Sequence, residues 1–355
     1  MTTVPSAGTA AGEPLLAVED LRVQFHTDDG VVKAADGVSF SVWPNEVVGI
    51  VGESGSGKTV SALSVLRLLP PTATVTGTVR FGGRNLLAAS RQELRAIRGD
   101  RIALIFQDAL TALNPLHRVG HQIAEMIRIH HDETSWKDAN QRAVELLGLV
   151  GIPTPAARAR QFPYEFSGGM RQRAMIAMAM ANDPDVLIAD EPTTALDVTT
   201  QAQVLELLKD VRRRTNSALV LITHDFGVVA GVADRVVVMY AGKVVESGTV
   251  DQVLLHPAHP YTKGLLDSMP RLEEENQRLL RIPGQPPSLI DVPPGCAFHP
   301  RCPFARTPGP CATAVPELRS VQDSNGQVAA CHFTGELADV PVQAGDVQAG
   351  AGAGA

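Results

Sequence analysis

The chain has 355 residues, of which 44% are hydrophobic and 19% charged, and its formal net charge is −7. This length allows one large domain with a smaller extension. A negative chain argues against a dedicated nucleic-acid-binding protein, which needs a basic face, so no nucleic-acid partner is expected. No apolar run reaches the roughly 18 residues of a membrane span, and residues 1–13 lack the basic start and apolar core of a signal peptide. We therefore expect a cytosolic protein.

Strand patterns open the chain. Residues 16–25 and 31–42 are rich in β-formers, and residues 46–51 form a short apolar run that is typical of a buried strand. A glycine-rich turn follows at once. Apolar residues then recur at helical spacing over residues 58–69, and the prolines at 70 and 71 end this pattern. The predicted order is strand, loop and helix.

The middle of the chain alternates between helical and strand patterns. Residues 101–106 predict another strand, whereas residues 116–162 are mostly helical in pattern and indicate a helical insertion. Short apolar strands follow at 186–189, 218–223 and 235–240, with helical stretches between them. This alternation predicts an α/β core in which helices cover a parallel sheet.

The two ends and the last quarter of the chain differ in composition from the rest. Residues 1–13 and 336–355 are small, polar or rich in Gly and Ala, and both are expected to be disordered. From about residue 267 to 335 the sequence is proline-rich and irregular, which predicts a small separate module. The four cysteines of the chain all lie there, and in a reducing compartment such clustering suggests metal more than disulfides. They are Cys296, Cys302, Cys311 and Cys331.

The glycine-rich turn fits the phosphate-loop pattern and lies where that mechanism requires it, between a buried strand and a helix. Glycines let successive backbone N–H groups turn toward a β-phosphate, and the helix N-terminus adds a favourable dipole. Lys58 is expected to bridge the β- and γ-phosphates, and the Thr59 hydroxyl to ligate Mg²⁺. The predicted phosphate-binding residues are Gly52, Ser54, Gly55, Ser56, Gly57, Lys58 and Thr59.

Polar side chains end three further predicted strands. Asp190 and Glu191 follow an apolar strand, at the sheet edge where such folds bind ligands. Asp190 is expected to hold Mg²⁺ through water, and Glu191 to orient and partly deprotonate the attacking water. A neutral His224 can hydrogen-bond the γ-phosphate and that water, and Gln107 can reach the metal or the water. Helix-capping acids, a structural histidine and a surface glutamine are the alternatives.

Residues 166–172, Phe-Ser-Gly-Gly-Met-Arg-Gln, resemble the signature motif of ABC-type ATPases. The phosphate loop, Gln107, the acidic pair, residues 195–197 and His224 occur in the order that this family uses, so the resemblance covers roughly residues 15–265. It implies an ABC-type nucleotide-binding domain at 14–266, with a RecA-like parallel sheet core, an N-terminal antiparallel β-subdomain and a helical subdomain at about 112–182. Phe166 replaces the common Leu and leaves Ser167, Gly168 and Gly169 unchanged.

Ser167 is expected to cap a helix whose free N–H groups form a second anion site. The resemblance implies that two such domains stack head to tail, so that each ATP lies between one chain's phosphate loop and the other chain's signature helix. Hydrolysis then removes the bridging phosphate and lets the halves part. Asp197 is expected at that interface. Phe25 is a candidate for stacking on the adenine, with a position in the β-subdomain core as the alternative.

Four segments, at 107–115, 259–262, 282–287 and 295–302, resemble the dipeptide and oligopeptide importer branch of this family. The branch implies an ATPase subunit at the cytoplasmic face of the membrane, held there by two permease subunits. Its other partners are a second ATPase subunit, more often an unlike chain than an identical one, and indirectly an extracytoplasmic peptide-binding protein. A related importer for nickel or another small solute, and a non-transport ABC ATPase, are the alternatives.

The cysteine spacings are C-x5-C, C-x8-C and C-x19-C, which are looser than the paired C-x2-C of zinc ribbons. Members of the importer branch carry such a cysteine set at this point. The resemblance therefore implies a [4Fe-4S] cluster held by the four thiolates. Zinc and unligated thiols are the alternatives.

Overall fold

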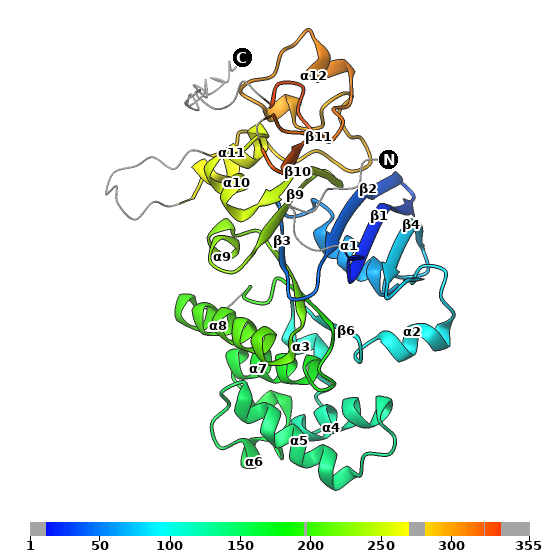
Figure 1. Cartoon of the computed structure of the whole chain (residues 1–355), viewed down its shortest axis with the longest axis vertical. Helices are drawn as coiled ribbons and strands as arrows, with labels where there is room; N and C mark the ends of the chain where they lie inside the picture. The colour runs from blue at the N-terminus through cyan, green and yellow to red at the C-terminus, as the bar shows by residue number, and fades with distance from the viewer. Residues whose placement is uncertain (1–11, 195–196, 270–280, 323, 335–355) are drawn as a thin grey trace, which may run out of the picture.

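The computed structural model describes residues 12–194, 197–269, 281–322 and 324–334. The molecule is elongated, with the C-terminal segment at its upper end, helices at its lower end and the strands between them (Figure 1). The terminal segments predicted to be disordered lie outside these ranges, apart from residues 12 and 13. In the part of the chain that is described, no helix is long and apolar enough to cross a membrane.

An eight-stranded sheet of order β11-β12-β10-β9-β3-β8-β7-β6 runs through the molecule. Five consecutive strands, β9, β3, β8, β7 and β6, are parallel, which confirms the α/β prediction. The strands are continuous apolar runs because helices or the second sheet cover both faces. Their bounds are β3 Val47–Val51, β6 Ile102–Ile105, β7 Val186–Asp190, β8 Ala218–Thr223, β9 Arg235–Tyr240 and β10 Lys243–Thr249.

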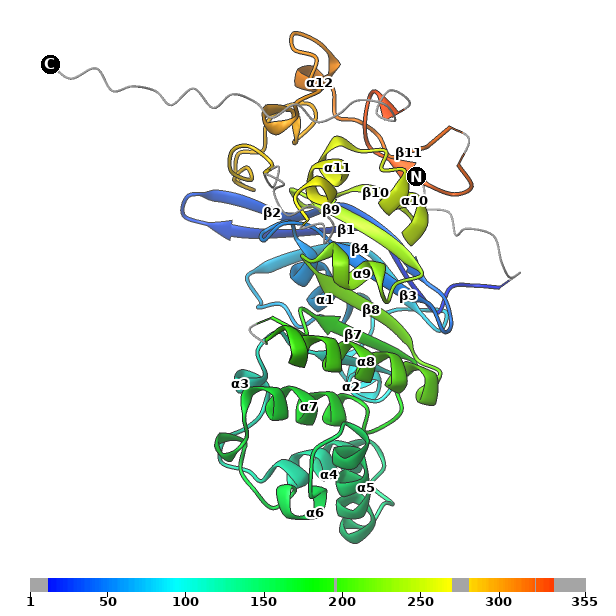
Figure 2. The same cartoon turned by 90° about the vertical axis from the view of Figure 1, so that its left-hand side faces the viewer.

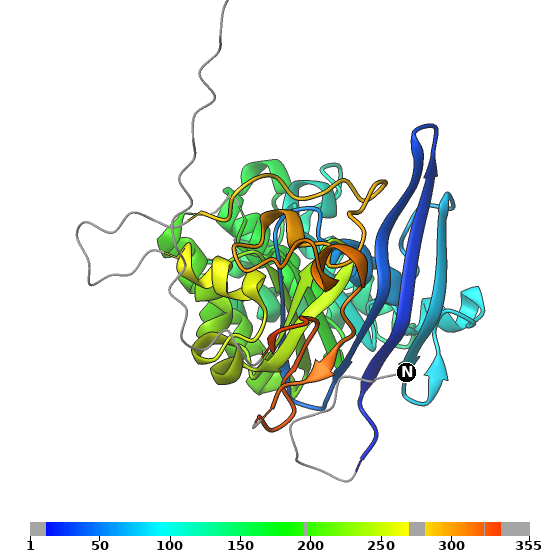
Figure 3. The ribbon, with the colours of Figure 1, turned by 90° about the horizontal axis from the view of Figure 1, so that it is seen from above.

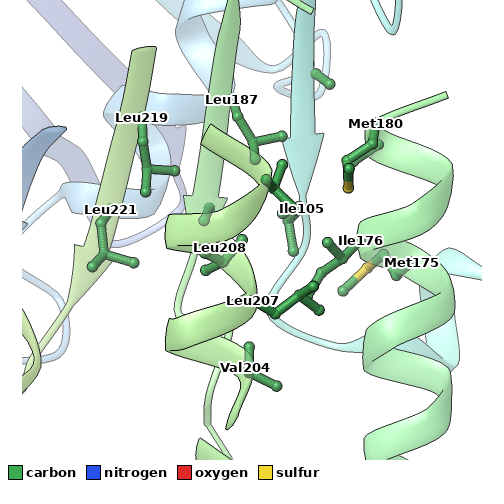
Figure 4. Close-up of a cluster of buried hydrophobic side chains, with 14 of the residues drawn as sticks. Ile105, Met175, Ile176, Met180, Leu187, Val204, Leu207, Leu208, Leu219 and Leu221 are labelled. Atoms are coloured by element: carbon green, nitrogen blue, oxygen red, sulfur yellow. The ribbon is translucent and has the colours of Figure 1, made fainter. Parts of the chain in front are cut away.

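One face of this sheet packs against helices α7 (Gly168–Ala179) and α8 (Val198–Thr215). Figure 4 shows Leu187, Leu219 and Leu221 of the sheet pointing toward Ile176 of α7 and Leu208 of α8. All five are at most 2% exposed, so this layer is a dry core. It fixes α7 and α8, and with them the residues at their N-termini, relative to the strand ends.

A second, four-stranded antiparallel sheet of order β2-β1-β4-β5 covers the other side together with helix α1 (Lys58–Val65). Helix α1 is shorter than predicted from the sequence, because the backbone at Arg67 turns into the left-handed region with φ 50°. The strands are β1 Leu16–Thr27, β2 Gly30–Val42, β4 Ala73–Phe81 and β5 Arg84–Asn85, and helix α2 (Arg91–Ile97) follows them.

Between β6 and β7 the chain is helical, as the sequence predicts, and this region forms the lower end of the molecule in Figure 2. In α5 the buried residues Ala139, Ala143, Leu146 and Leu147 recur every three or four positions and face α4 and α7. The elements are α3 Ala109–Ala112, α4 Val119–His130, α5 Trp136–Leu149, α6 Pro155–Arg158, the 3-10 turn Pro163–Glu165, and α7.

The C-terminal segment departs from the prediction of a separate module, because its last strands extend the main sheet. Strand β12 (Val328–Ala329) pairs antiparallel with β10, and β11 (Arg319–Ser320) pairs with β12. Seen from above, the segment lies across the β9–β10 end of the sheet (Figure 3). Its helical elements are the 3-10 turn His299–Arg301 and α12 Pro310–Thr313. The three helices that precede it are α9 Phe226–Ala230, α10 Val250–Leu255 and α11 Pro260–Asp267.

Candidate functional site

The phosphate loop leads from the end of β3 into α1. Gly57 has φ 98°, and a Cβ atom on it would lie 2.2 Å from the carbonyl oxygen of Ala34, so only glycine fits there. Gly55 also has a positive φ, of 78°. Ser54 and Gly55 are exposed, whereas Ser56 is buried. The loop therefore offers an open concave backbone at the start of a helix, which is the geometry of an anion site.

Lys58 is 5% exposed and its ammonium lies against the loop. Its Nζ donates to the carbonyl oxygens of Gly52, at 2.7 Å, and Glu53, at 2.9 Å. Burial lowers the pKa of Lys58, while the nearby carboxylates of Glu191 and Asp190 raise it. The side chain is thus a cation held at the phosphate loop and close to the acidic pair, which suits its expected role.

Thr59 and Asp190 come together from α1 and β7. The Thr59 hydroxyl donates to Asp190 Oδ1 at 3.0 Å. Burial raises the pKa of Asp190, and that hydrogen bond opposes the rise. Two oxygen ligands of this kind, beside a phosphate loop, fit the preference of Mg²⁺ for hard oxygen donors. The structure brings the two residues together, as the sequence analysis expects.

Glu191 is the centre of a second group of side chains. Gln107 Nε2 donates to its Oε2 at 3.2 Å, and His224 Nδ1 lies 3.4 Å from its Oε1. The Thr194 hydroxyl donates to Oε2 at 2.8 Å. Three predicted residues from three different strand ends thus meet at one carboxylate. Thr194, which the sequence analysis missed, adds an orienting hydrogen bond.

The predicted signature residues lie at the N-terminus of α7. Ser167 caps this helix, because its Oγ accepts a hydrogen bond from the Met170 amide at 3.3 Å. Ser167 and Gly168 are exposed, so the free N–H groups of the first turn face solvent. This helix N-terminus is therefore open to solvent, as Ser54 and Gly55 of the phosphate loop are.

Asp197 caps α8 and Phe25 lies in β1. The Asp197 carboxylate accepts from the amide and the hydroxyl of Thr200, at 2.9 and 2.7 Å, and these hydrogen bonds lower the pKa of Asp197. Ala195 and Leu196, the other residues of that motif, lie outside the described residues. Phe25 is half-buried and packs against the core of the N-terminal sheet, so both interpretations of it stay open.

Glu53 of the phosphate loop, another residue that the sequence analysis missed, binds the C-terminal segment. Its carboxylate oxygens accept hydrogen bonds from the two terminal nitrogens of Arg301, at 2.6 and 2.9 Å. Its amide donates to the Tyr261 hydroxyl at 2.7 Å. Tyr261 and Arg301 lie in the segments 259–262 and 295–302, which the sequence analysis singled out for their resemblance to importers. That resemblance was the only indication in the sequence analysis that these residues matter.

The four cysteines line one cavity of about 230 Å³ together with Phe298 and Phe333. All four are free thiols. Burial raises the pKa of Cys302 to about 12 and that of Cys331 to about 11. Among the described residues, no three His, Cys, Asp or Glu side chains are arranged to hold one metal ion. The geometry therefore gives no support to zinc, nor by itself to the expected [4Fe-4S] cluster.

Comparisons with known proteins identify the family of the chain. A family model described as "ABC transporter" matches residues 35–194, and one described as "Oligopeptide/dipeptide transporter, C-terminal region" matches residues 245–311. A probable peptide ABC transporter ATP-binding protein of Sinorhizobium fredii is 50% identical over 92% of this chain and 97% of its own length. The dipeptide transport ATP-binding protein DppD of Bacillus subtilis is 53% identical over 82% of this chain and 87% of its own length.

Solved structures show the same fold. A dimeric ATP-binding cassette in a post-hydrolysis state, bound to ADP and Pi, matches with a TM-score of 0.60 and 27% identity, over 66% of this chain and 98% of that one. The matched family models and the relatives of nearly full coverage lead to one conclusion. The chain belongs to the ATP-binding proteins of ABC transporters, in the oligopeptide and dipeptide transporter group.

Proposed function

We propose that this chain binds and hydrolyses ATP to power the import of dipeptides and oligopeptides through an ABC transporter in the cytoplasmic membrane. The observation that carries the proposal is the convergence of Glu191, Gln107 and His224 beside the Thr59–Asp190 pair. The peptide specificity rests on the match of residues 245–311 to the peptide transporter C-terminal region, and on relatives named as peptide transport ATP-binding proteins.

In this proposal the loop residues 52–59 hold the triphosphate, with Lys58 at the β- and γ-phosphates. Thr59 ligates Mg²⁺ directly, Asp190 binds it through water and Gln107 reaches it or the attacking water. Glu191 accepts a proton from that water, and His224 hydrogen-bonds the γ-phosphate. Mg²⁺ supplies charge neutralisation along the phosphates when it is bound.

A second ATPase subunit completes the site. The exposed Ser167 and Gly168 of one chain, together with the partly buried Gly169, bind the γ-phosphate held by the other chain, with Asp197 at the interface and Phe25 on the adenine. The solvent-facing helix end and the solvent-facing phosphate loop support this arrangement. The matched structure is described as a dimer bound to ADP and Pi. We propose an unlike ATPase as the partner, although an identical chain satisfies the same geometry.

Two permease subunits hold this pair at the cytoplasmic face of the membrane, and an extracytoplasmic binding protein selects the peptide. The chain itself then has no contact with the peptide. We also propose that the 14–266 part, with its helical subdomain at about 112–182, is the motor, and that residues 267–335 are particular to peptide importers. The peptide transporter model matches residues 245–311, which includes the first part of this segment, and that overlap supports the proposal.

A [4Fe-4S] cluster held by Cys296, Cys302, Cys311 and Cys331 belongs to the same proposal. The four thiols line one cavity. The support for a cluster is the resemblance of the cysteine set to that of the importer branch, because the geometry of the described thiols favours neither an iron-sulfur cluster nor zinc. Iron, zinc and acid-labile sulfide measured on protein purified without oxygen test this assignment, and zinc without sulfide would overturn it.

Glu191→Gln in the purified transporter tests the motor. Loss of the general base lowers the ATPase rate by at least about a hundredfold, while ATP still binds and holds the two ATPases together. Steady-state hydrolysis and size-exclusion chromatography with Mg-ATP measure both effects. An unchanged rate, or a variant that no longer binds ATP, contradicts the role of Glu191.

The transported solute needs its own test. Vesicles that contain the complete transporter are expected to hydrolyse ATP faster when the binding protein carries a peptide, and to accumulate labelled peptide. Lys58→Ala abolishes both effects. Stimulation by nickel in place of peptide would favour the related importer class.

A further inference from the structure

The C-terminal segment reaches the phosphate loop through one buried ion pair. Arg301 is 6% exposed and meets both carboxylate oxygens of Glu53 in a two-point contact. Its Nε also donates to the Pro283 carbonyl at 2.8 Å, and Nη1 lies 3.3 Å from the Tyr240 hydroxyl. All three nitrogens of the guanidinium therefore donate hydrogen bonds, and these contacts fix the orientation of the Glu53 carboxylate.

Buried aromatic rings surround Arg301. Tyr240, Tyr261 and Phe298 form an aromatic cluster with ring centroids 4.6 to 5.4 Å apart, and the arginine lies over the Tyr240 and Phe298 rings. The Tyr261 hydroxyl accepts from the Glu53 amide. Tyr240 ends β9, whereas Tyr261 and Phe298 come from the segment after β10. The cluster thus joins the sheet and the C-terminal segment directly beneath the second residue of the loop.

The ion pair also affects the charge that a nucleotide meets. Glu53 follows Gly52, and its own carbonyl oxygen accepts from Lys58 Nζ at 2.9 Å. An unpaired Glu53 carboxylate would repel a triphosphate, and this repulsion would be only weakly screened because the carboxylate is partly buried. Because Arg301 neutralises it, the loop can carry an acidic residue and still bind an anion.

From these contacts we propose that Arg301 is a positioning residue for ATP binding, through which the C-terminal segment holds the phosphate loop in shape and neutralises Glu53. This proposal rests on the ATP-binding role of the loop. It assigns to the segment an effect on the nucleotide site within its own chain. It does not depend on what the cysteine cavity holds.

Binding of Mg-ADP and Mg-ATP to the full-length chain, measured by titration calorimetry, tests the proposal with a double-mutant cycle. Arg301→Met leaves Glu53 charged and unpaired, and is expected to raise the Kd by about tenfold or more. In steady-state assays of the complete transporter the KM for ATP rises more than kcat falls. Glu53→Gln removes the repulsion, so Glu53→Gln combined with Arg301→Met recovers most of the lost affinity.

A matched control exists at the other end of the same strands. Arg235 and Glu46 form a similar buried pair, 4% and 15% exposed, with Arg235 Nε 2.9 Å from Glu46 Oε1. This pair lies at the starts of β3 and β9, whereas the phosphate loop follows the end of β3. Arg235→Met is expected to lower the Tm by a similar amount and to leave the Kd for nucleotide unchanged.

Three outcomes would overturn the proposal: an unchanged Kd in Arg301→Met, no recovery in the double variant, or an equal loss of affinity in Arg235→Met. If Arg301→Met does not fold, Arg301→Gln replaces it, because glutamine also removes the charge that neutralises Glu53 and keeps a polar side chain. A raised Kd in Arg301→Gln supports the proposal and an unchanged one overturns it. Lys58→Ala tests the ATP-binding role of the loop separately from the role of Arg301. If this variant binds nucleotide normally, the assignment of the phosphate site is wrong.

Discussion

Glu191 shows how a single residue is held in a conformation that its chemistry needs. Its φ of 45° lies in the left-handed region, which costs a side-chain-bearing residue about 1–3 kcal/mol. The amide of Glu191 is fixed by the Ile222 carbonyl at 2.9 Å, so the strand end of β8 keeps the backbone there. This turn aims the carboxylate at Gln107 and His224. The sequence predicts the residue and its edge of the sheet, but not the strained backbone that orients it.

Glu53 shows the opposite case, a functional contact that the sequence conceals. Its partner Arg301 is 248 positions away, and neither residue belongs to a periodic pattern. A glutamate inside a phosphate loop looks like a solvated variable position until the fold brings an arginine to it. Pairings of this kind depend on the tertiary structure and cannot be derived from local spacing.

Glu246 provides a residue-scale prediction. It is fully buried, and it accepts hydrogen bonds from the amides of Ala258 and His259 and from the Gln327 side chain. Burial nevertheless raises the pKa of Glu246 to about 7. A raised folded-state pKa means that its contribution to stability is complete below the unfolded value and is lost as pH rises through 7.

Glu246→Gln removes this titration. Relative to the variant, the wild-type chain is expected to lose about 2–3 kcal/mol of unfolding free energy between pH 5 and pH 8. Burial lowers the pKa of the neighbouring His259 to about 3, so its imidazole does not titrate in the folded state within this window. Thermal melts of both proteins across the pH series measure the difference. A constant gap between their stabilities contradicts the assignment.

At the scale of elements, the strands and helices around the site can be predicted because each is long enough to show its hydrophobic periodicity. Strands β7, β8 and β9 appear where the sequence predicts them, within a few residues, and helix α5 lies inside the stretch that is predicted to be helical. Strands β11 and β12 have two residues each, which is too short for any alternation. The pairing of β12 with β10, and hence the attachment of the C-terminal segment, was therefore not predictable.

Helix α7 carries an element-scale prediction about Ser167. The Oγ of Ser135 caps α5 in the same way, with the Asp138 amide 3.1 Å away. Ser167→Ala and Ser135→Ala are each expected to lower the unfolding free energy by about 1 kcal/mol, because each leaves a first-turn amide without its partner. Only Ser167→Ala is expected to weaken ATP-dependent pairing of the two ATPase subunits and to slow hydrolysis. Equal functional effects of the two variants would exclude a ligand-binding role for Ser167.

At the scale of the whole molecule, the described part of the C-terminal segment is built into the core of the cassette. Phe298 and Val328 are 2% and 1% exposed, and the first of them packs on Tyr240 of β9. Gln327 bonds the buried Glu246 of β10. A segment that shares a sheet, an aromatic cluster and a buried carboxylate with the rest of the chain has no core of its own. It is expected to unfold together with the cassette.

The chain carries natural probes for this expectation. Its four cysteines all lie in the C-terminal segment, and its two tryptophans, Trp43 and Trp136, lie in the cassette. In a urea titration, thiol reactivity, or iron release from iron-loaded protein, should follow the same curve as tryptophan fluorescence. Phe298→Ala should lower the unfolding free energy by about 3–5 kcal/mol. Both curves should therefore move together to lower urea concentration. Thiols that become reactive well before the tryptophan signal changes would show a segment that opens alone, and would weaken the physical basis for its hold on the phosphate loop.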